Sequence, residues 1–361
     1  MKLGGHISIS DVASVNIFSN SKPPMKTKKY IDSLKLEWYE DTFDLSEFKK
    51  DEKQAEWLEY LEPHVNLKTL KIMNYLGVRF VGWVGASSFT KLKILSLQSC
   101  KNCNKLPPLG QLPSLEELKI CRMDGVQHVG REFCSMLMAS PSSSQNKIAF
   151  PSLKRLIFSN MTNWKAWDGV EIGDFPSLHY IRISVCPRLI KFPQWPFMSS
   201  VKEMELDYSG VPDVSNFHSL TNLTIAFMSQ EYSKWMSRCY FPMLQHLRLS
   251  FGSAESVHLS QKVLPSLKTL GIHDSEELRV VTGLKNLTSL NSLIIEACPN
   301  LEFKGLPATL KQVKFNRCPL FEKGFKEQQH MRNVLMIEAH NSDDEEEEKE
   351  EMDGEDDDNM D

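Results

Sequence analysis

Four cysteines are the most closely spaced group in this sequence that could bind a metal. They follow the pattern Cys-x2-Cys-x17-Cys-x12-Cys, from Cys100 through Cys103 and Cys121 to Cys134. Four thiolates at separations of this kind can hold a zinc ion in a tetrahedral site. Free cysteines also serve as small apolar side chains when they are buried. The repeat pattern around these cysteines favours structural thiols, because it indicates which way each thiol points.

Groups for catalysis are not gathered in any recognisable motif. The ten histidines are scattered, and the sequence contains neither His-Glu-x-x-His nor Gly-x-Ser-x-Gly. Catalysis needs several groups of matched pKa that converge on one point. We therefore expect no enzymatic activity, no cofactor and no metal.

A repeated pattern runs through most of the chain and accounts for the cysteine positions. Leu-x-x-Leu-x-Ile/Leu/Phe recurs at steps of 25, 23, 38, 25, 23, 19, 24, 23, 23 and 20 residues. The copies begin at Leu67, Leu92, Leu115, Leu153, Leu178, Val201, Leu220, Leu244, Leu267, Leu290 and Leu310. A period of about 20–29 residues is typical of leucine-rich repeats. We predict an α/β leucine-rich repeat solenoid, a horseshoe with a concave parallel β-sheet and a loop-rich convex side.

Each copy divides its residues between the core and the surface. Positions 1, 4 and 6 are apolar and should point inward, whereas positions 3, 5 and 7 should face out from the sheet. Cys100, Cys186, Cys298 and Cys318 all occupy position 9, beneath the turn that leaves the sheet. Cys121 occupies position 7 and should face away from Cys100. This arrangement favours structural thiols over a zinc site.

The outward positions are the candidate binding surface. On a parallel sheet they form rows of side chains about 5 Å apart. The predicted protein-binding residues are Lys71, Lys119, Arg155, Tyr180, Arg182, Glu203, Glu205, His246 and Arg248. Arginine and tyrosine are favoured contact residues in interfaces, and the row predicts a basic group beside an acidic pair. An ordinary solvated sheet face carries the same residue types, so both interpretations stay open.

The chain divides into a repeat domain and an acidic segment. We assign 1–342 to the repeat domain, with degenerate repeats at 1–66, clear repeats at 67–320 and a terminal capping segment at 321–342. The last 19 residues, 343–361, contain 14 Asp or Glu and one Lys, and this composition predicts disorder.

Some weaker signals fall outside the regular repeat pattern. Ile7–Ile9 and Leu34–Leu36 are similar to degenerate strands, and Gln54–Leu61 predicts a short helix with Trp57, Leu58 and Leu61 on one face. The 38-residue step contains a Ser- and Pro-rich stretch, Ser140–Gln145, which predicts an inserted loop. Val334–Ile337 predicts a last strand over the core.

Charge and cysteine content limit the compartment and the partners. The acidic segment carries a charge of −13, which leaves 33 acidic and 41 basic residues, net +8, on the remainder. That excess is dilute and follows no basic stripe, so we expect no nucleic acid partner.

No apolar run could span a membrane, and eight cysteines without a secretion signal predict the cytosol, with the nucleus as the second possibility. The acidic segment could solubilise the chain, fold back on the basic body or bind basic proteins.

Several motifs resemble those of a known family. They are Leu58–Leu70, with Leu-Glu-Pro-His-Val-Asn-Leu inside it, Asn102–Leu115, with Pro-Pro-Leu-Gly-Gln-Leu-Pro, Met161-x-x-Trp164-x-x-Trp167, and the Cys-Pro pairs Cys186-Pro187, Cys298-Pro299 and Cys318-Pro319. This sequence resembles the leucine-rich repeat region of plant coiled-coil nucleotide-binding leucine-rich repeat disease-resistance proteins. Phe80-Val81-Gly82-Trp83 departs from it, since the family usually has Pro after the Phe. The resemblance covers about residues 3–337.

The resemblance implies recognition in plant innate immunity. In that family the repeats sense pathogen effectors or guarded host proteins, and they hold the switch domain inactive. This sequence has no Gly-x-x-x-x-Gly-Lys-Ser/Thr loop, so nucleotide hydrolysis is not carried over. It would be a fragment or a free-standing repeat protein that acts in trans, with an N-terminal edge that frays or associates because covering repeats are missing. The alternative is a substrate-recognition subunit of a ubiquitin ligase, although residues 1–60 do not predict the helical F-box bundle that it needs.

Overall fold

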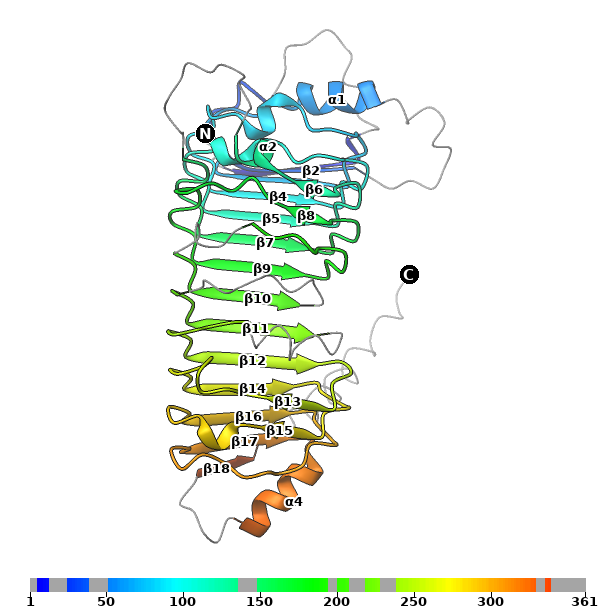
Figure 1. The fold of residues 1–361 in the computed structure, drawn as a ribbon. Coiled ribbons are helices and arrows are strands. Elements are labelled where there is room, and N and C mark those ends of the chain that lie inside the picture. The colour runs from blue at the N-terminus through cyan, green and yellow to red at the C-terminus, as the bar shows by residue number, and fades with distance from the viewer. Residues whose placement is uncertain are drawn as a thin grey trace, which may run out of the picture.

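The computed structural model describes residues 5–12, 25–38, 51–135, 148–193, 200–207, 218–227, 238–328 and 335–338. The predicted acidic segment and the predicted loop Ser140–Gln145 lie outside these residues. In the described part, short parallel strands stack into a 14-stranded sheet, with the first strands at one end and the last at the other (Figure 1). The predicted solenoid with a parallel sheet is confirmed.

The strands follow chain order through the sheet. They are β1 (Gly5–Ser10), β2 (Ile31–Glu37), β3 (Thr69–Met73), β4 (Ile94–Gln98), β5 (Glu117–Cys121), β7 (Arg155–Ser159), β9 (Tyr180–Ser184), β10 (Glu203–Asp207), β11 (Asn222–Phe227), β12 (His246–Phe251), β14 (Thr269–His273), β16 (Ser292–Glu296), β17 (Gln312–Asn316) and β18 (Leu335–Glu338). Both degenerate N-terminal strands and the predicted last strand are present.

One turn of the solenoid illustrates why the pattern folds this way. Leu92, Leu95 and Leu97, at positions 1, 4 and 6, are each at most 1% exposed. The residue at position 8 then turns the chain out of the sheet in the left-handed region, with φ between 46° and 56°. This conformation is found at Asn74, Ser99, Arg122, Asn160, Val185, Asp274, Ala297 and Arg317. The position-9 side chain is thereby brought under the turn, and Cys100 there is fully buried.

The convex side combines loops, short helical turns and two small sheets. The helical turns are η2 (Gly82–Gly85), η3 (Leu109–Gln111), α2 (Arg131–Cys134) and η5 (Leu284–Asn286). The small parallel sheets pair β6 (His128–Val129) with β8 (Ala166–Trp167), and β13 (Ser256–His258) with β15 (Val280–Thr282). The loops agree with the predicted loop-rich convex side, but the two small sheets were not predicted.

Aromatic side chains fill the core beneath the convex segments. Phe150 and Phe175, each followed by Pro, are fully buried, and their rings stack with centroids 4.6 Å apart. Phe158 packs against Trp164 and Trp167, with ring centroids at 4.7 and 5.5 Å. At these two positions the aromatic residue before Pro fills the core.

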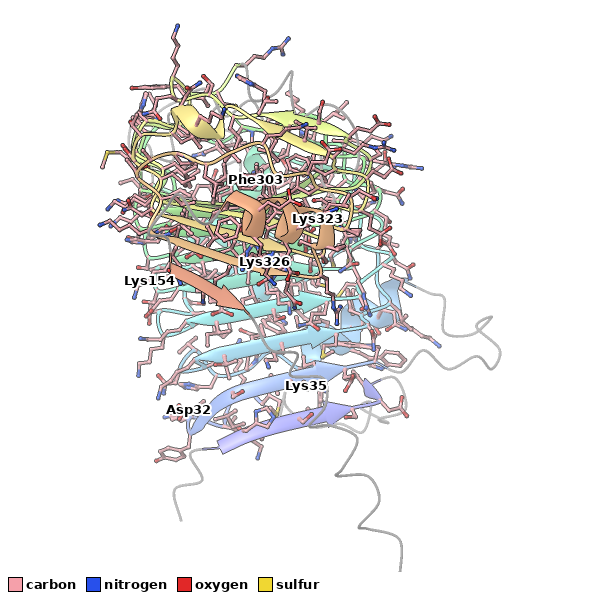
Figure 2. All side chains as sticks on the ribbon, turned by 90° about the horizontal axis from the view of Figure 1, so that it is seen from below. Asp32, Lys35, Lys154, Phe303, Lys323 and Lys326 are labelled. Carbon is pink, nitrogen blue, oxygen red and sulfur yellow. The ribbon has the colours of Figure 1, made fainter. Side chains whose placement is uncertain are left out.

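Helices lie at the two ends of the stack (Figure 1). Helix α1 (Asp51–Tyr60) contains most of the predicted Gln54–Leu61 helix, and Trp57, Leu58 and Leu61 are each buried as expected. At the other end, α4 (Pro319–Gln328) was not predicted as a helix. Figure 2 shows Phe303 beside α4, on which Lys323 and Lys326 lie.

Candidate functional site

The strand register places the predicted site residues in two rows across the sheet. Position 3 gives Glu117, Arg155, Tyr180, Glu203, Asn222 and His246 as successive partners. Position 5 gives Lys71, Ser96, Lys119, Ile157, Arg182, Glu205, Thr224 and Arg248. The rows are therefore as expected, whereas the contacts within them could not be read from the sequence.

Arg155 and Tyr180 form a cation–π contact in the site. They lie opposite one another on β7 and β9, and the guanidinium carbon of Arg155 sits 4.1 Å from the centroid of the Tyr180 ring. Glu117 on β5 approaches Arg155 from the other side, at 4.0 Å. Tyr180 was expected to face solvent, but the residue is only 8% exposed. Burial, with the nearby Glu205 carboxylate, raises the pKa of its hydroxyl.

Arg182 and Glu205 form an ion pair across β9 and β10. Their side-chain nitrogen and oxygen lie 3.4 Å apart. The predicted basic group and acidic pair are thus in contact, since Arg182 pairs with Glu205 between adjacent strands. Asp207, at position 7 of β10, lies in the same electrostatic group, and partial burial raises the pKa of its carboxyl despite the attraction of Arg182.

The remaining predicted residues lie apart from this centre. Lys71 lies between Lys35 and Ser96 on the neighbouring strands, and Lys119 is separated from Arg182 by Ile157. His246 and Arg248 are on β12, with β11 between them and the acidic residues of β10. Within the described part of the chain, no ion pair is formed by Lys71, Lys119 or Arg248.

A buried histidine on the same face was missed by the sequence analysis. His273, at position 7 of β14, is 8% exposed, and its Nδ1 lies 2.8 Å from Glu296 Oε2. Its Nε2 is buried without a hydrogen-bond partner among the described residues. The ring has room because Gly271 precedes it, and a Cβ there would lie 2.5 Å from that Nε2. Burial, and secondarily Arg248, lowers the pKa of this imidazole. A glycine at position 5 is the one sequence signal that pointed to it.

The cysteines occupy the places that the repeat assigns to them. All eight are free thiols, and the Sγ of Cys103 donates to the Gly77 carbonyl at 3.1 Å. Burial raises the pKa of Cys100 to about 12 and that of Cys134 to about 12, so both are neutral near pH 7. Cys121 is partly exposed. In the ranges that the structure describes, no group of three or more His, Cys, Asp or Glu is placed to hold a metal ion. Nor does any described helix have the length and apolar character needed to cross a membrane.

Comparison with known sequences finds related repeats over part of this chain. The R13L1/DRL21 leucine-rich repeats match residues 1–123, and the leucine-rich repeats of plant disease resistance proteins of the RPS2-like type match residues 79–205. The chain is a leucine-rich repeat module related to plant disease-resistance proteins. The resemblance seen in the motifs is thereby confirmed.

Individual relatives agree with this placement. The chain is 31% identical, over 286 residues and 77% of its length, to disease resistance RPP13-like protein 1 of Arabidopsis thaliana. It is 31% identical, over 233 residues and 62% of its length, to disease resistance protein RGA4 of Solanum bulbocastanum. It spans only 25% and 22% of the lengths of these two relatives.

Solved structures that resemble the chain are more distant. The leucine-rich repeat domain of the type III effector XopL matches with a TM-score of 0.42 at 16% identity, over 75% of this chain and 76% of that one. Human 5T4 matches with a TM-score of 0.32 at 18% identity, over 68% of this chain and 76% of that one.

Proposed function

We propose that the chain is a non-catalytic protein-recognition module of plant innate immunity that binds through its concave sheet face. Its partners would be pathogen effectors, guarded host proteins, or the switch domain of a resistance protein regulated in trans. The relation to plant disease-resistance proteins supports the setting. The binding surface rests on one observation, the cluster of Arg155, Tyr180, Arg182 and Glu205 on three adjacent strands.

This cluster has properties that suit recognition. Glu117 and the Tyr180 ring already hold Arg155, and Glu205 holds Arg182, so a partner meets guanidinium groups that are largely ordered beforehand. Such ordering lowers the entropic cost of binding, and arginine is enriched among the residues that dominate interface energetics. A partner carboxylate could exchange with Glu117 or Glu205 without leaving either arginine unpaired.

The proposal is tested with paired arginine variants in plant tissue. The chain is crosslinked to its partners in leaf cells, with and without a pathogen effector, and recovered for mass spectrometry. The double variant Arg155→Ala and Arg182→Ala removes two cations from the sheet face. A matched control, Arg188→Ala and Arg279→Ala, removes two exposed cations that lie outside the strands of the large sheet.

The outcomes separate the candidate functions. Partners that are lost with the sheet variant and kept with the control would support recognition through the concave face. Equal retention by both variants would refute it, provided that urea unfolding shows the variants to be folded. Recovery of a ubiquitin-ligase scaffold protein would support the alternative of a substrate-recognition subunit.

A further inference from the structure

Another row of charged residues runs along the edge of the large sheet where the strands begin. Apart from Asp32, which lies within β2, these residues stand at position 2, one before each strand of the large sheet from β3 to β17. The backbone N–H of each residue after Asp32 donates to the carbonyl of the residue before it in the row. The row reads Asp32, Lys68, Lys93, Glu116, Lys154, His179, Lys202, Thr221, Gln245, Lys268, Asn291 and Lys311. We call its six lysines the lysine ladder. Asp32 and Lys154 lie on the same side of the molecule in Figure 2.

The lysines of the ladder outnumber the acids that could neutralise them. Glu116 accepts from both Lys93 and Lys154 at 2.8 Å, and Asp32 lies 3.2 Å from Lys68. The other three lysines, Lys202, Lys268 and Lys311, are all exposed, and no carboxylate of the described residues forms an ion pair with them. Among the described residues, the half of the edge nearer the C-terminal end therefore presents positive charge that no carboxylate pairs with.

We propose that the lysine ladder binds the chain's own acidic segment, Asp343–Asp361. The two sequences are complementary, since the segment carries 14 carboxylates and one lysine. This inference goes beyond the proposed recognition function and does not depend on it. It concerns a different surface, the edge of the sheet rather than its face.

The distances allow this contact without strain. Lys311 directly precedes β17, the neighbour of β18, and Lys202 precedes β10, six strands away from β18. At about 4.8 Å per strand, six steps span roughly 29 Å, and crossing a five-residue strand adds about 17 Å. The 23 residues after Glu338 span up to about 75 Å when extended, so they reach the ladder as far as Lys154.

Carbodiimide crosslinking of the full chain tests the contact directly, because it joins a lysine amine to a carboxylate only when the two touch. We expect crosslinks from the acidic segment to Lys202, Lys268 and Lys311 in 20 mM salt, and their loss in 500 mM salt, because exposed ion pairs are screened. Mixing chains labelled with 14N and 15N separates contacts within one chain from contacts between chains. Crosslinks only between chains, or mainly to Lys71, Lys119 and Lys314 on the sheet face, would overturn the proposal.

A matched variant pair gives a second measurement. A chain whose segment carboxylates are changed to amides is titrated with a synthetic peptide of residues 343–361. Changing the three ladder lysines Lys202, Lys268 and Lys311 to Gln should weaken peptide binding about tenfold, since each exposed pair contributes a few-fold in affinity. The control changes Arg182, Arg248 and Lys314 to Gln, which removes the same charge from strands at similar distances. An equal loss of affinity in the control would show that only net charge matters and would overturn the proposal.

Discussion

The buried carboxylate of Asp174 joins three segments of the convex side, and its removal should be the most damaging polar substitution that we identify. Asp174 is 3% exposed. Its Oδ1 accepts from the Ala149 amide at 2.9 Å, its Oδ2 accepts from the Glu171 amide at 2.9 Å, and Arg131 forms an ion pair with it. Arg131 and Ala149 lie on either side of residues 136–147, so this one carboxylate ties both ends of the 38-residue step to the next repeat.

The expected magnitude follows from these contacts. Removing one partner of a buried ion pair typically costs about 3–5 kcal/mol, because the other charge stays buried. The Arg131 side chain is 20% exposed, and Glu171 remains 3.3 Å from it, so part of its charge stays compensated. We therefore expect Asp174→Ala to destabilise this region by about 3 kcal/mol. Glu171→Gln is the control, and it should cost less than about 1 kcal/mol because that side chain is 53% exposed.

Hydrogen exchange followed by mass spectrometry measures this loss locally. A solenoid can open one region at a time, so exchange in the peptides around Ala149 and Glu171 is more informative than a global melting temperature. A cost of about 3 kcal/mol corresponds to exchange about 150-fold faster in Asp174→Ala. If exchange rises less than tenfold, or no more than in Glu171→Gln, the carboxylate does not hold these segments together and the reasoning is wrong.

Three further substitutions test local features of the repeat. Val185→Asn should stabilise the chain by about 1 kcal/mol in urea unfolding, because a β-branched residue is strained at φ 53° and Asn tolerates this region. Lysine contacts lower the pKa of Glu116 to about 2, so its stabilisation is complete above its ordinary pKa and is lost as pH falls toward 2; Glu116→Gln should remove that part of the pH dependence. Gly271→Ala should displace His273 and raise its lowered pKa in an NMR titration. Wild-type stability should fall as pH drops below the ordinary histidine pKa, and this slope should weaken in the variant, whereas an unchanged slope would contradict the role of burial.

The large sheet could be predicted because one rule repeats. An apolar residue at positions 4 and 6 fixes which side chains enter the core, and a parallel strand then has one register that keeps them there. Hence Leu95 lies opposite Leu118, and Lys119 lies opposite Ile157, as the spacing alone indicates. The weakest copies, at β1 and β2, also followed the rule because Ile7 and Leu34 fall at the same position.

The convex side could not be predicted in the same way. Its segments differ in length from copy to copy, so no position recurs and the contacts depend on particular neighbours. Helix α4 begins at Pro319, a residue that favours the first turn of a helix. The prediction treated this stretch only as a cap, because its apolar residues Phe321 and Phe325 are few. Their burial depends on Phe303 and Phe315, which come from earlier repeats.

For the candidate site, spacing predicted the rows but not the interactions. Whether Arg182 is available or paired depends on which residue follows it in the next copy, and the step from β9 to β10 brings Glu205 there. Rotamers then decide that Arg155 covers the Tyr180 ring instead of extending into solvent. Neither choice is encoded in the repeat pattern, because positions 3 and 5 accept any polar residue.

The paired arginines of the sheet face and the lysines along the sheet edge imply different roles in binding. On the sheet face, Arg155 and Arg182 lie beside carboxylates, so their fields largely cancel beyond the screening length of about 8 Å at physiological salt. Recognition there must depend on short-range shape and hydrogen bonding. Lys202, Lys268 and Lys311, which form no ion pair with a carboxylate of the described residues, share one sign, and such a row attracts acidic surfaces from farther away and speeds association. If the acidic segment occupies that edge, it should slow the capture of acidic partners while leaving the specificity of the sheet face unchanged.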